Sequence, residues 1–310
     1  GGWAALWNAE TDEVLRRFFG HYGGVTAIAF SPDGQQLLTG SEDYTARLWD
    51  VSTGRQIRVL EGHEEYVTAV AFSPNGQRIL TGSDWDGIAK VWNAETGEEL
   101  LTFTAHADDL DSLLTVAFSP DGQNALTCGT LEAKLWNIES GEIIRTFGGH
   151  DYELASAAFS RDGKQIVTSD YSSSRVWNAE TGEWVQTLEF AAGPAVFSPD
   201  GTKILSGSDS MYFETETYPL RLWEIETGEE IQTLLGPSGF LSFIQYSPDG
   251  SRILSGSRWA ASVTQWDAGT GEKIRSLSGH VDIVNSVAFS PDGEKVLTAG
   301  VNDRVARLWN

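Results

Sequence analysis

The sequence predicts an all-β protein assembled from seven copies of one unit, and three observations support this prediction. A Phe-Ser-Pro-Asp-Gly motif first seen at 30–34 recurs in similar form, starting at Phe72, Phe118, Phe159, Phe197, Tyr246 and Phe289. Tryptophan followed by Asn, Asp or Glu recurs every 41 to 46 residues, at Trp7, Trp49, Trp92, Trp136, Trp177, Trp223, Trp266 and Trp309. Short β-branched segments with turn residues at their ends separate these markers, so no unit has room for an amphipathic helix.

Each unit is expected to contain four short strands. In the first unit, residues 25–30 and 36–39 flank a Ser-Pro-Asp-Gly turn and should form a hairpin. Residues 45–49 supply the third strand, and a Ser-Thr-Gly turn leads to the fourth at 56–60. Such a sheet has two apolar faces, which can both be buried only when sheets stack radially around a ring. We therefore predict a seven-bladed β-propeller of four-stranded antiparallel blades, a single domain spanning residues 1–310.

The repeats resemble those of the WD40 family, which carry Gly-His ahead of the first strand and Trp-Asp at the end of the third. The likeness covers essentially the whole chain, and the regular units are similar to those of bacterial WD40 proteins. The resemblance implies that the N-terminal strand, 14–19, closes the ring by pairing with the terminal strand, 304–309. Residues 1–8 then form an additional strand, because the Trp-Asn pair at 7–8 repeats that at 309–310. We interpret them as the remnant of a preceding blade in a longer protein, with pairing across a dimer as the alternative.

The resemblance also implies a buried hydrogen-bonded set of His, Ser or Thr, Asp and Trp in each regular unit. The matching residues are His21, Thr39, Asp43 and Trp49 in unit 1, His63, Thr81, Asp86 and Trp92 in unit 2, and His280, Thr298, Asp303 and Trp309 in unit 7. Units 3 and 4 match in part, since Thr130 stands near the Asp position of one and Asp170 is one residue out of register in the other. Units 5 and 6 lack the histidine. All five histidines thus have structural positions, so we expect no catalytic residue, metal site or cofactor.

The charge of the chain excludes some partners. With 44 acidic and 21 basic residues the net charge is −23, which opposes the binding of nucleic acid. No apolar stretch of about 20 residues predicts a membrane span. The single cysteine, Cys128, rules out an intramolecular disulfide framework, and no secretory signal opens the chain, so we expect a cytoplasmic protein. Many acids recur in the turns of the repeat, which favours a role in solubility, with a site for a basic partner as the alternative.

The top face of the predicted ring carries the loops from fourth to first strands and from second to third strands, and there the units differ. Aromatic residues and methionine beside acids are typical of interface anchors. We therefore expect a protein or peptide partner to bind at Tyr22, Tyr66, Trp85, Asp108, Asp109, Tyr152, Met211, Tyr212, Phe213, Arg258 and Trp259.

Three functions remain open at this stage. The leading hypothesis is a non-catalytic protein–protein interaction scaffold that uses the top face. The alternative is a recognition or sensor domain of a larger multidomain enzyme or signalling protein. Catalysis in the central channel is the least favoured, because no histidine is left to act as a general base.

Overall fold

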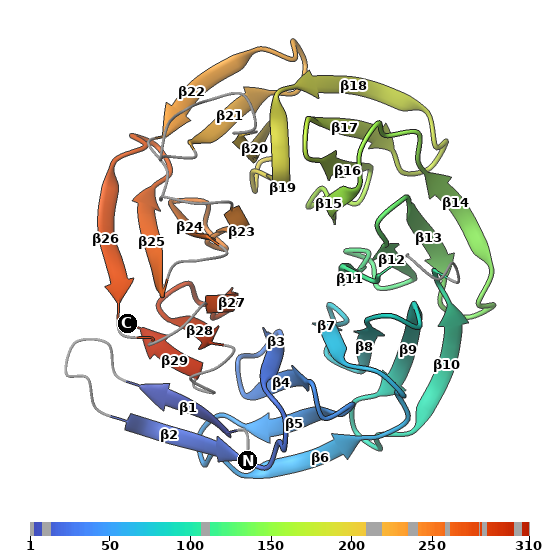
Figure 1. Ribbon diagram of the computed structural model, residues 1–310, viewed down its shortest axis with the longest axis vertical. Helices are drawn as coiled ribbons and strands as arrows, with labels where there is room; N and C mark the ends of the chain where they lie inside the picture. The colour runs from blue at the N-terminus through green and yellow to red at the C-terminus, as the bar shows by residue number, and fades with distance from the viewer. Residues whose placement is uncertain are drawn as a thin grey trace.

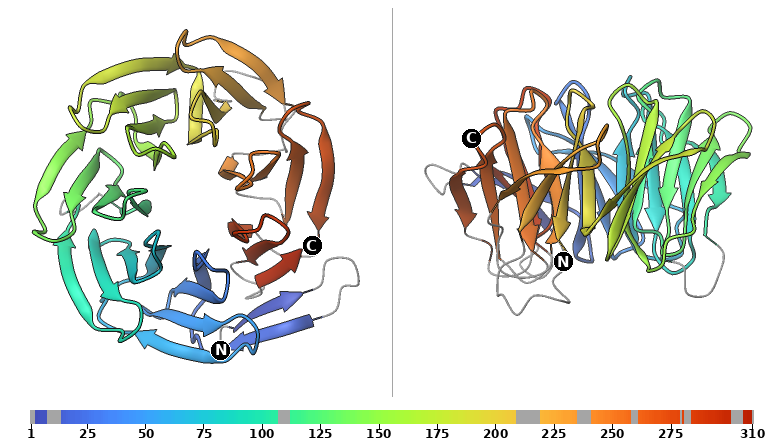
Figure 2. Two further views of the ribbon diagram at one scale, coloured as in Figure 1. Left: turned by 180° about the vertical axis from the view of Figure 1, so that it is seen from behind. Right: turned by 90° about the horizontal axis from the view of Figure 1, so that it is seen from above.

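The computed structural model describes residues 3–7, 14–106, 112–208, 219–234, 241–257, 261–278, 280, 284–300 and 306–309. Within these ranges the chain is built from strands that form a ring of sheets around a central channel (Figures 1 and 2). The same ranges contain no helix, and hence none long and apolar enough to cross a membrane.

Six sheets have four antiparallel strands each in the described part of the chain, and they are numbered blades 1 to 6. Blade 1 consists of β3 (Val25–Phe30), β4 (Gln36–Ser41), β5 (Ala46–Asp50) and β6 (Gln56–Leu60). Blade 2 consists of β7 (Val67–Phe72), β8 (Arg78–Ser83), β9 (Ile88–Asn93) and β10 (Glu99–Thr104). Blade 3 consists of β11 (Thr115–Phe118), β12 (Asn124–Cys128), β13 (Ala133–Asn137) and β14 (Ile143–Phe147).

The other three blades follow the same order from the channel outwards. Blade 4 consists of β15 (Leu154–Phe159), β16 (Gln165–Asp170), β17 (Ser173–Asn178) and β18 (Trp184–Glu189). Blade 5 consists of β19 (Ala191–Phe197), β20 (Lys203–Ser208), β21 (Leu220–Glu224) and β22 (Glu230–Leu234). Blade 6 consists of β23 (Leu241–Tyr246), β24 (Arg252–Ser257), β25 (Ser262–Asp267) and β26 (Lys273–Ser278).

The prediction of seven four-stranded blades closed by the N-terminal strand is wrong. Between blades 6 and 1 lie a three-stranded sheet, β27 (Val284–Phe289), β28 (Val296–Gly300) and β29 (Ala306–Trp309), and a separate hairpin, β1 (Trp3–Trp7) with β2 (Val14–Phe19). β2 pairs with β1, and no ladder joins it to β29 in the described residues; β1 is the strand that lies beside β29 (Figure 1). Pairing with the neighbouring strand closes a short loop, which costs less entropy than pairing with a strand at the far end of the chain.

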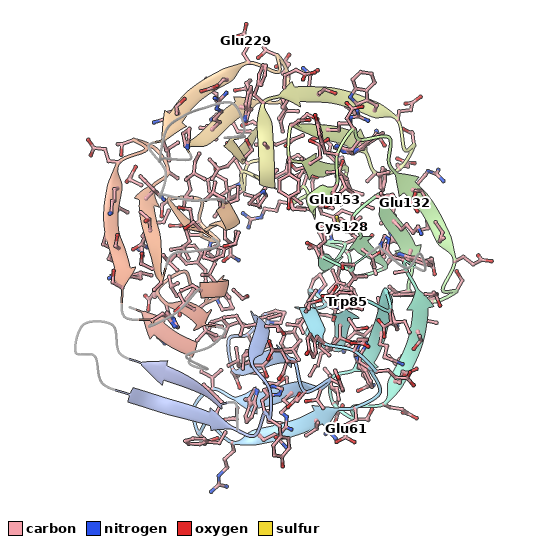
Figure 3. The ribbon with its side chains drawn as sticks, viewed as in Figure 1. Glu61, Trp85, Cys128, Glu132, Glu153 and Glu229 are labelled. Atoms are coloured by element: carbon pink, nitrogen blue, oxygen red, sulfur yellow. The ribbon has the colours of Figure 1, made fainter. Side chains whose placement is uncertain are left out.

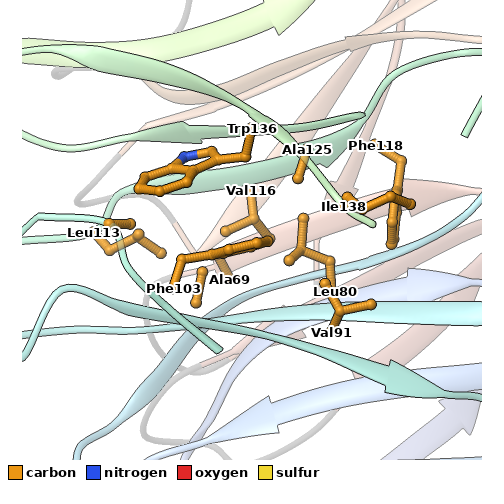
Figure 4. Close-up of a cluster of buried hydrophobic side chains, with 12 residues drawn as sticks. Ala69, Leu80, Val91, Phe103, Leu113, Val116, Phe118, Ala125, Trp136 and Ile138 are labelled. Atoms are coloured by element: carbon orange, nitrogen blue, oxygen red, sulfur yellow. The ribbon is translucent and has the colours of Figure 1, made fainter. Parts of the chain in front are cut away.

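Apolar residues from adjacent sheets form the core, as radial stacking requires. At the boundary of blades 2 and 3, Leu80 and Phe103 pack against Val116 and Trp136 (Figure 4). The rings of Phe103 and Trp136 stack with centroids 5.0 Å apart. Each boundary buries a comparable cluster, so a blade is stable only between its neighbours.

The ring closes through packing. Phe18 of β2 is fully buried between the three-stranded sheet and blade 1, in a cluster with Leu297 and Trp49. Its ring meets the Trp49 indole edge-on, with centroids 5.7 Å apart. The N-terminal hairpin therefore covers the apolar gap between the first and last repeats without adding a strand to either sheet.

A second set of contacts joins the sheets at the bottom face of the ring, the face opposite the top-face loops. There the proline of each Ser-Pro-Asp-Gly turn lies against the glycine of the next turn, and the pair Pro291 and Gly34 connects the three-stranded sheet to blade 1. Between blades 4 and 5 the contact is missing, because Arg161 replaces proline and no atom lies within 4 Å of a side chain built on Gly201.

Candidate functional site

A hydrogen-bonded chain fixes the top-face loops of blade 1. Trp49 Nε1 donates to Thr39 Oγ1 at 2.9 Å, and that oxygen lies 2.7 Å from His21 Nε2. On the other side of the imidazole, Nδ1 lies 2.9 Å from Asp43 Oδ2. Burial lowers the pKa of His21, so the ring is neutral at pH 7. Nδ1–H therefore donates to the carboxylate, while Nε2 accepts from the threonine hydroxyl.

Asp43 connects two loops of the top face. Its carboxylate accepts from the backbone amide of Tyr22 at 2.9 Å and from Thr45 Oγ1 at 2.6 Å. Burial alone would raise the pKa of Asp43, but the hydrogen bonds from His21 and Thr45 hold it well below its usual range. The carboxylate is therefore charged at neutral pH and fixes the loop of Tyr22 against its own loop.

Blade 2 departs from the expected set, because Ser83 stands between the histidine and the carboxylate. Trp92 Nε1 donates to Thr81 Oγ1 at 2.8 Å, and that oxygen lies 2.6 Å from His63 Nε2, as in blade 1. His63 Nδ1, however, lies 2.9 Å from Ser83 Oγ, which donates to Asp86 Oδ1 at 2.5 Å. The predicted set is therefore incomplete in blade 2, since His63 reaches Asp86 through the hydroxyl of Ser83. Burial lowers the pKa of His63 to about 4, because the distant carboxylate offsets it only weakly.

Blade 4 contains a complete chain, although the offset of Asp170 predicted an incomplete one. His150 Nδ1 lies 3.0 Å from Asp170 Oδ2, and its Nε2 lies 2.7 Å from Thr168 Oγ1. Trp177 donates to the same threonine at 2.8 Å. The loop at 171–172 is shorter than its counterpart in blade 1, so an acid one position earlier reaches the imidazole. Burial would raise the pKa of Asp170, yet the hydrogen bonds from His150 and two backbone amides bring it to about 2.

The blades without a histidine carry serine where the others carry threonine. Trp223 Nε1 donates to Ser206 Oγ, and Trp266 Nε1 donates to Ser255 Oγ, both at 2.9 Å. Ser206 Oγ donates in turn to the carbonyl of Gly207 at 2.8 Å, so its proton has a partner on its own strand. Blades 5 and 6 thus keep the hydrogen bond from the tryptophan indole to the second strand, but they have no histidine to extend it to the top-face loops.

The remaining two histidines also contact threonine. In blade 3, His106 Nε2 lies 3.2 Å from Thr127 Oγ1, and in the three-stranded sheet His280 Nε2 lies 2.7 Å from Thr298 Oγ1. Asp303 lies outside the described residues, as does the side chain of Trp309.

These sets contain the residue types of a nucleophilic triad, but they form buried hydrogen-bonded networks that hold neighbouring strands and loops together. The side chains of Thr39, Thr81 and Thr168 have no exposed surface. A hydroxyl that no substrate can reach cannot serve as a nucleophile. In the described ranges, no group of three His, Cys, Asp or Glu side chains is placed to hold a metal ion.

The described members of the predicted partner site are exposed aromatic side chains. Tyr22 and Trp85 expose 83% and 72% of their surface, and Tyr66 and Tyr152 expose 40% and 52%. The other members lie outside the described residues: Asp108, Asp109, Met211, Tyr212, Phe213, Arg258 and Trp259.

Three described residues other than glycine have a left-handed backbone, and all three are exposed aromatics. The angle φ is 68° at Tyr44, 61° at Trp85 and 66° at Phe190. This conformation costs about 1–2 kcal/mol for a residue with a side chain. Tyr44 occupies the loop position that Gly87 fills in blade 2 with a φ of 59°. Glycine would adopt this backbone without that cost.

Four exposed aromatic side chains follow one another over blades 1 and 2, and we name them the aromatic row: Tyr22, Tyr44, Tyr66 and Trp85. Tyr22 and Tyr44 lie in the two loops that the carboxylate of blade 1 connects. The Tyr44 ring stacks on Tyr66 across the blade boundary, with centroids 5.7 Å apart. The carbonyl of Tyr66 accepts from the amide of Asp84 at 2.9 Å, directly before Trp85. One ring stack and two hydrogen bonds to the backbone thus connect the loops of the aromatic row across two blades.

Sequence reasoning missed Tyr44, Tyr171 and Phe190. Tyr171 is half-exposed in the second-to-third loop of blade 4, and Phe190 alone joins β18 to β19. Tyr44 could have been found by aligning the repeats, which places it opposite Gly87. No repeat signal marks Phe190, because the loop that it replaces is missing from this unit.

The central channel was the site of the least favoured hypothesis. A cavity of about 390 Å³ opens among the inner strands of blades 1, 2, 3 and 6 and the three-stranded sheet. Its lining includes Phe30, Phe72, Phe118, Phe289 and Gln245, and none of the lining side chains is ionisable. General acid–base chemistry requires such a group, so the walls of this cavity do not support it.

Comparison with known proteins agrees with this architecture. The family model described as "WD domain, G-beta repeat" matches six segments: residues 12–50, 54–93, 97–137, 141–178, 228–267 and 271–310. Six matches contradict the expected seven, as does the count of four-stranded blades, although the last match contains the three-stranded sheet. The segment left between the fourth and fifth matches contains most of blade 5, where the histidine loop is missing.

One curated relative shares a single repeat length with this chain. The periodic tryptophan protein 2 homolog of Neurospora crassa is 45% identical over 42 residues, which cover 14% of this chain and 5% of that protein. The chain thus matches only a small part of that relative. The six family matches, in contrast, extend over most of the sequence, and the chain therefore belongs to the WD40 repeat family.

Proposed function

We propose that this protein is an interaction scaffold whose aromatic row binds a protein or peptide partner. WD40 propellers are typically interaction scaffolds and are generally non-catalytic, which supports the class of function. A fold alone does not identify a binding surface, so the site assignment depends on the residues of this chain.

The observation that carries the proposal is the strained backbone of Tyr44 and Trp85. Both hold large aromatic side chains in solvent at an energetic cost that glycine would avoid. The loops beneath them are fixed by the His21 and His63 hydrogen-bonded sets. Rigid exposed aromatics are favourable anchors, because little side-chain entropy is lost when a partner covers them.

The acidic residues around the aromatic row support a partner of basic character. Glu61 and Glu64 are exposed in the loop that leads to Tyr66, and the chain as a whole carries a net charge of −23. Complementary charge would speed association and favour cationic surfaces over acidic ones.

Affinity capture with variants of two exposed tryptophans tests the proposal. Proteins recovered from native lysate by the wild-type chain are quantified against those recovered by Trp85→Ala and by Trp184→Ala. Trp184 is similarly exposed but lies on the outer strand β18, so it is the matched control. We expect a partner that is lost with Trp85→Ala and kept with Trp184→Ala. Equal recovery by all three proteins would exclude the aromatic row as the binding surface.

A further inference from the structure

We propose that the blade 2 end of the aromatic row, Tyr66 and Trp85, binds an arginine side chain in a cationic segment of the partner. This inference rests on the proposed function and specifies the chemistry of the group that the row recognises.

The two ends of the aromatic row differ in their cation partners. The guanidinium of Arg47 lies 5.9 Å from the centroid of the Tyr22 ring, at the blade 1 end. Within blade 2 the ammonium of Lys90 lies 5.9 Å from the Trp92 ring, on the buried side of the blade. No lysine or arginine of the described residues lies over the ring of Tyr66 or Trp85 in a comparable position. Trp85 is nevertheless far more exposed than Trp92.

The stack beneath Tyr66 prepares it to receive a flat group. One face of the Tyr66 ring is covered by Tyr44, whose plane is tilted by only 21°. Tyr66 still exposes 40% of its surface, so the stack leaves part of the side chain open to a partner. Trp85 follows the loop residue whose amide donates to the Tyr66 carbonyl. Figure 3 shows Trp85 close to the channel, with Glu61 nearer to the outer rim.

The charge of the surrounding loops favours a cation. The four loops at 20–24, 42–45, 61–66 and 84–87 contain seven carboxylates and no lysine or arginine. Several of these carboxylates are used within the loops: Asp43 by His21, Asp86 by Ser83, and Glu42 by the amide of Gly24. Glu61 and Glu64 have no such partner among the hydrogen bonds of the described residues, and both are exposed in the loop that ends at Tyr66.

The combination selects arginine over lysine. A guanidinium is planar, stacks on aromatic rings and donates two parallel hydrogen bonds to a carboxylate, whereas an ammonium is a compact and strongly hydrated point charge. Aromatic faces next to carboxylates offer both kinds of contact. The bases of single-stranded nucleic acid also stack on aromatic side chains, but the carboxylates repel their phosphates. A second copy of this chain carries the same excess of negative charge and is disfavoured for the same reason.

Fluorescence anisotropy with labelled peptides tests the inference on the whole chain. Three peptides of equal length carry arginine, lysine or glutamate at the same alternate positions, separated by glycine and serine. We expect the arginine peptide to bind at least threefold more tightly than the lysine peptide, and the glutamate peptide not to bind. Trp85→Ala should weaken binding of the arginine peptide about tenfold, while Trp184→Ala should leave it unchanged.

The outcomes separate this inference from the proposed function. Equal affinity for the arginine and lysine peptides, with no effect of Trp85→Ala, would show diffuse charge attraction and overturn the inference. If no peptide bound, but a partner from lysate were still lost with Trp85→Ala, the scaffold proposal would stand and the inference would fall. Tighter binding of an oligonucleotide or of a second copy of the chain would also contradict it.

Discussion

The rings of Tyr44 and Tyr66 stack across the boundary between blades 1 and 2, with centroids 5.7 Å apart and planes inclined by 21°. In this position Tyr44 has a left-handed backbone with a φ of 68°. The same residue thus combines a strained backbone with a contact that joins two blades at the exposed surface. A binding role accounts for both features, because it requires an aromatic side chain where the loop geometry favours glycine.

Replacing Tyr44 with glycine should separate stability from binding. Relief of the left-handed backbone gains about 1–2 kcal/mol, while loss of the ring stack removes about 0.5–1.5 kcal/mol and the added chain entropy of glycine about 0.5–1 kcal/mol. We expect the free energy of unfolding to change by no more than about 1.5 kcal/mol, while affinity for the partner falls. Chemical denaturation and titration measure the two quantities. A loss of stability above about 2 kcal/mol would show that Tyr44 is mainly structural.

The buried His63 should make stability depend on pH. Burial lowers its pKa in the folded state to about 4, whereas the unfolded chain has a value near 6.5. The unfolded state therefore binds more protons between these values, so stability is greatest above pH 6.5 and falls as the pH drops towards 4. The full loss amounts to about 3 kcal/mol for this one group.

His63→Gln provides the control for this pH dependence. The difference in unfolding free energy between wild type and variant, measured by urea denaturation from pH 7.5 to pH 4.5, should shrink as the pH falls. A difference that stays constant would mean that His63 titrates alike in the folded and unfolded chains.

The effects of replacing His21 and Asp43 on the free energy of unfolding should be strongly coupled. His21→Ala leaves the half-buried carboxylate without its imidazole donor and is expected to destabilise the protein by about 1–3 kcal/mol. In a double-mutant cycle with Asp43→Asn, the two effects should overlap by at least about 0.5 kcal/mol. Tyr22→Ala changes a neighbouring exposed side chain and should have little effect on the melting temperature. Simple additivity of the two substitutions would show that the hydrogen bond contributes nothing to stability.

Arg161→Pro should stabilise the boundary between blades 4 and 5. The amide of Gly163 donates to Ser160 at 2.9 Å, as the equivalent amide of Gly34 donates to Ser31 at 2.8 Å, so the turn already has the geometry that accepts proline elsewhere. Proline restricts the unfolded chain, which is worth about 0.4–1 kcal/mol, and it supplies the missing contact. Arg161→Ala is the control that removes the arginine alone. A lower melting temperature for the proline variant would mean that this turn differs from the others.

Local features of the fold could be predicted closely from the sequence. The strands expected at 25–30 and 56–60 match β3 and β6, because apolar alternation and turn residues encode them within a few positions. The number of complete blades could not be predicted in this way. Seven motifs are present, but the pairing of 14–19 depends on competition between a neighbouring strand and one at the far end of the chain.

The exposure of a single side chain could be predicted from the sequence, whereas contacts that depend on loop length could not. Trp85 stood out as a tryptophan outside the repeat positions, and it is exposed. The Asp170 contact was missed because the spacing from Trp177 ignores the shortened loop. The role of Ser83 was also missed, because a serine at this position recurs in several units and the sequence does not reveal that in blade 2 it bridges His63 and Asp86.

The central claim is that the aromatic row is the partner-binding surface. The most direct test is isothermal titration calorimetry of a partner captured by the wild-type chain, carried out with wild type, the double variant Tyr66→Ala/Trp85→Ala, and Trp184→Ala. We expect the double variant to bind at least tenfold more weakly, with Trp184→Ala equal to wild type and all three proteins alike in melting temperature. An unchanged dissociation constant in the double variant would contradict the claim.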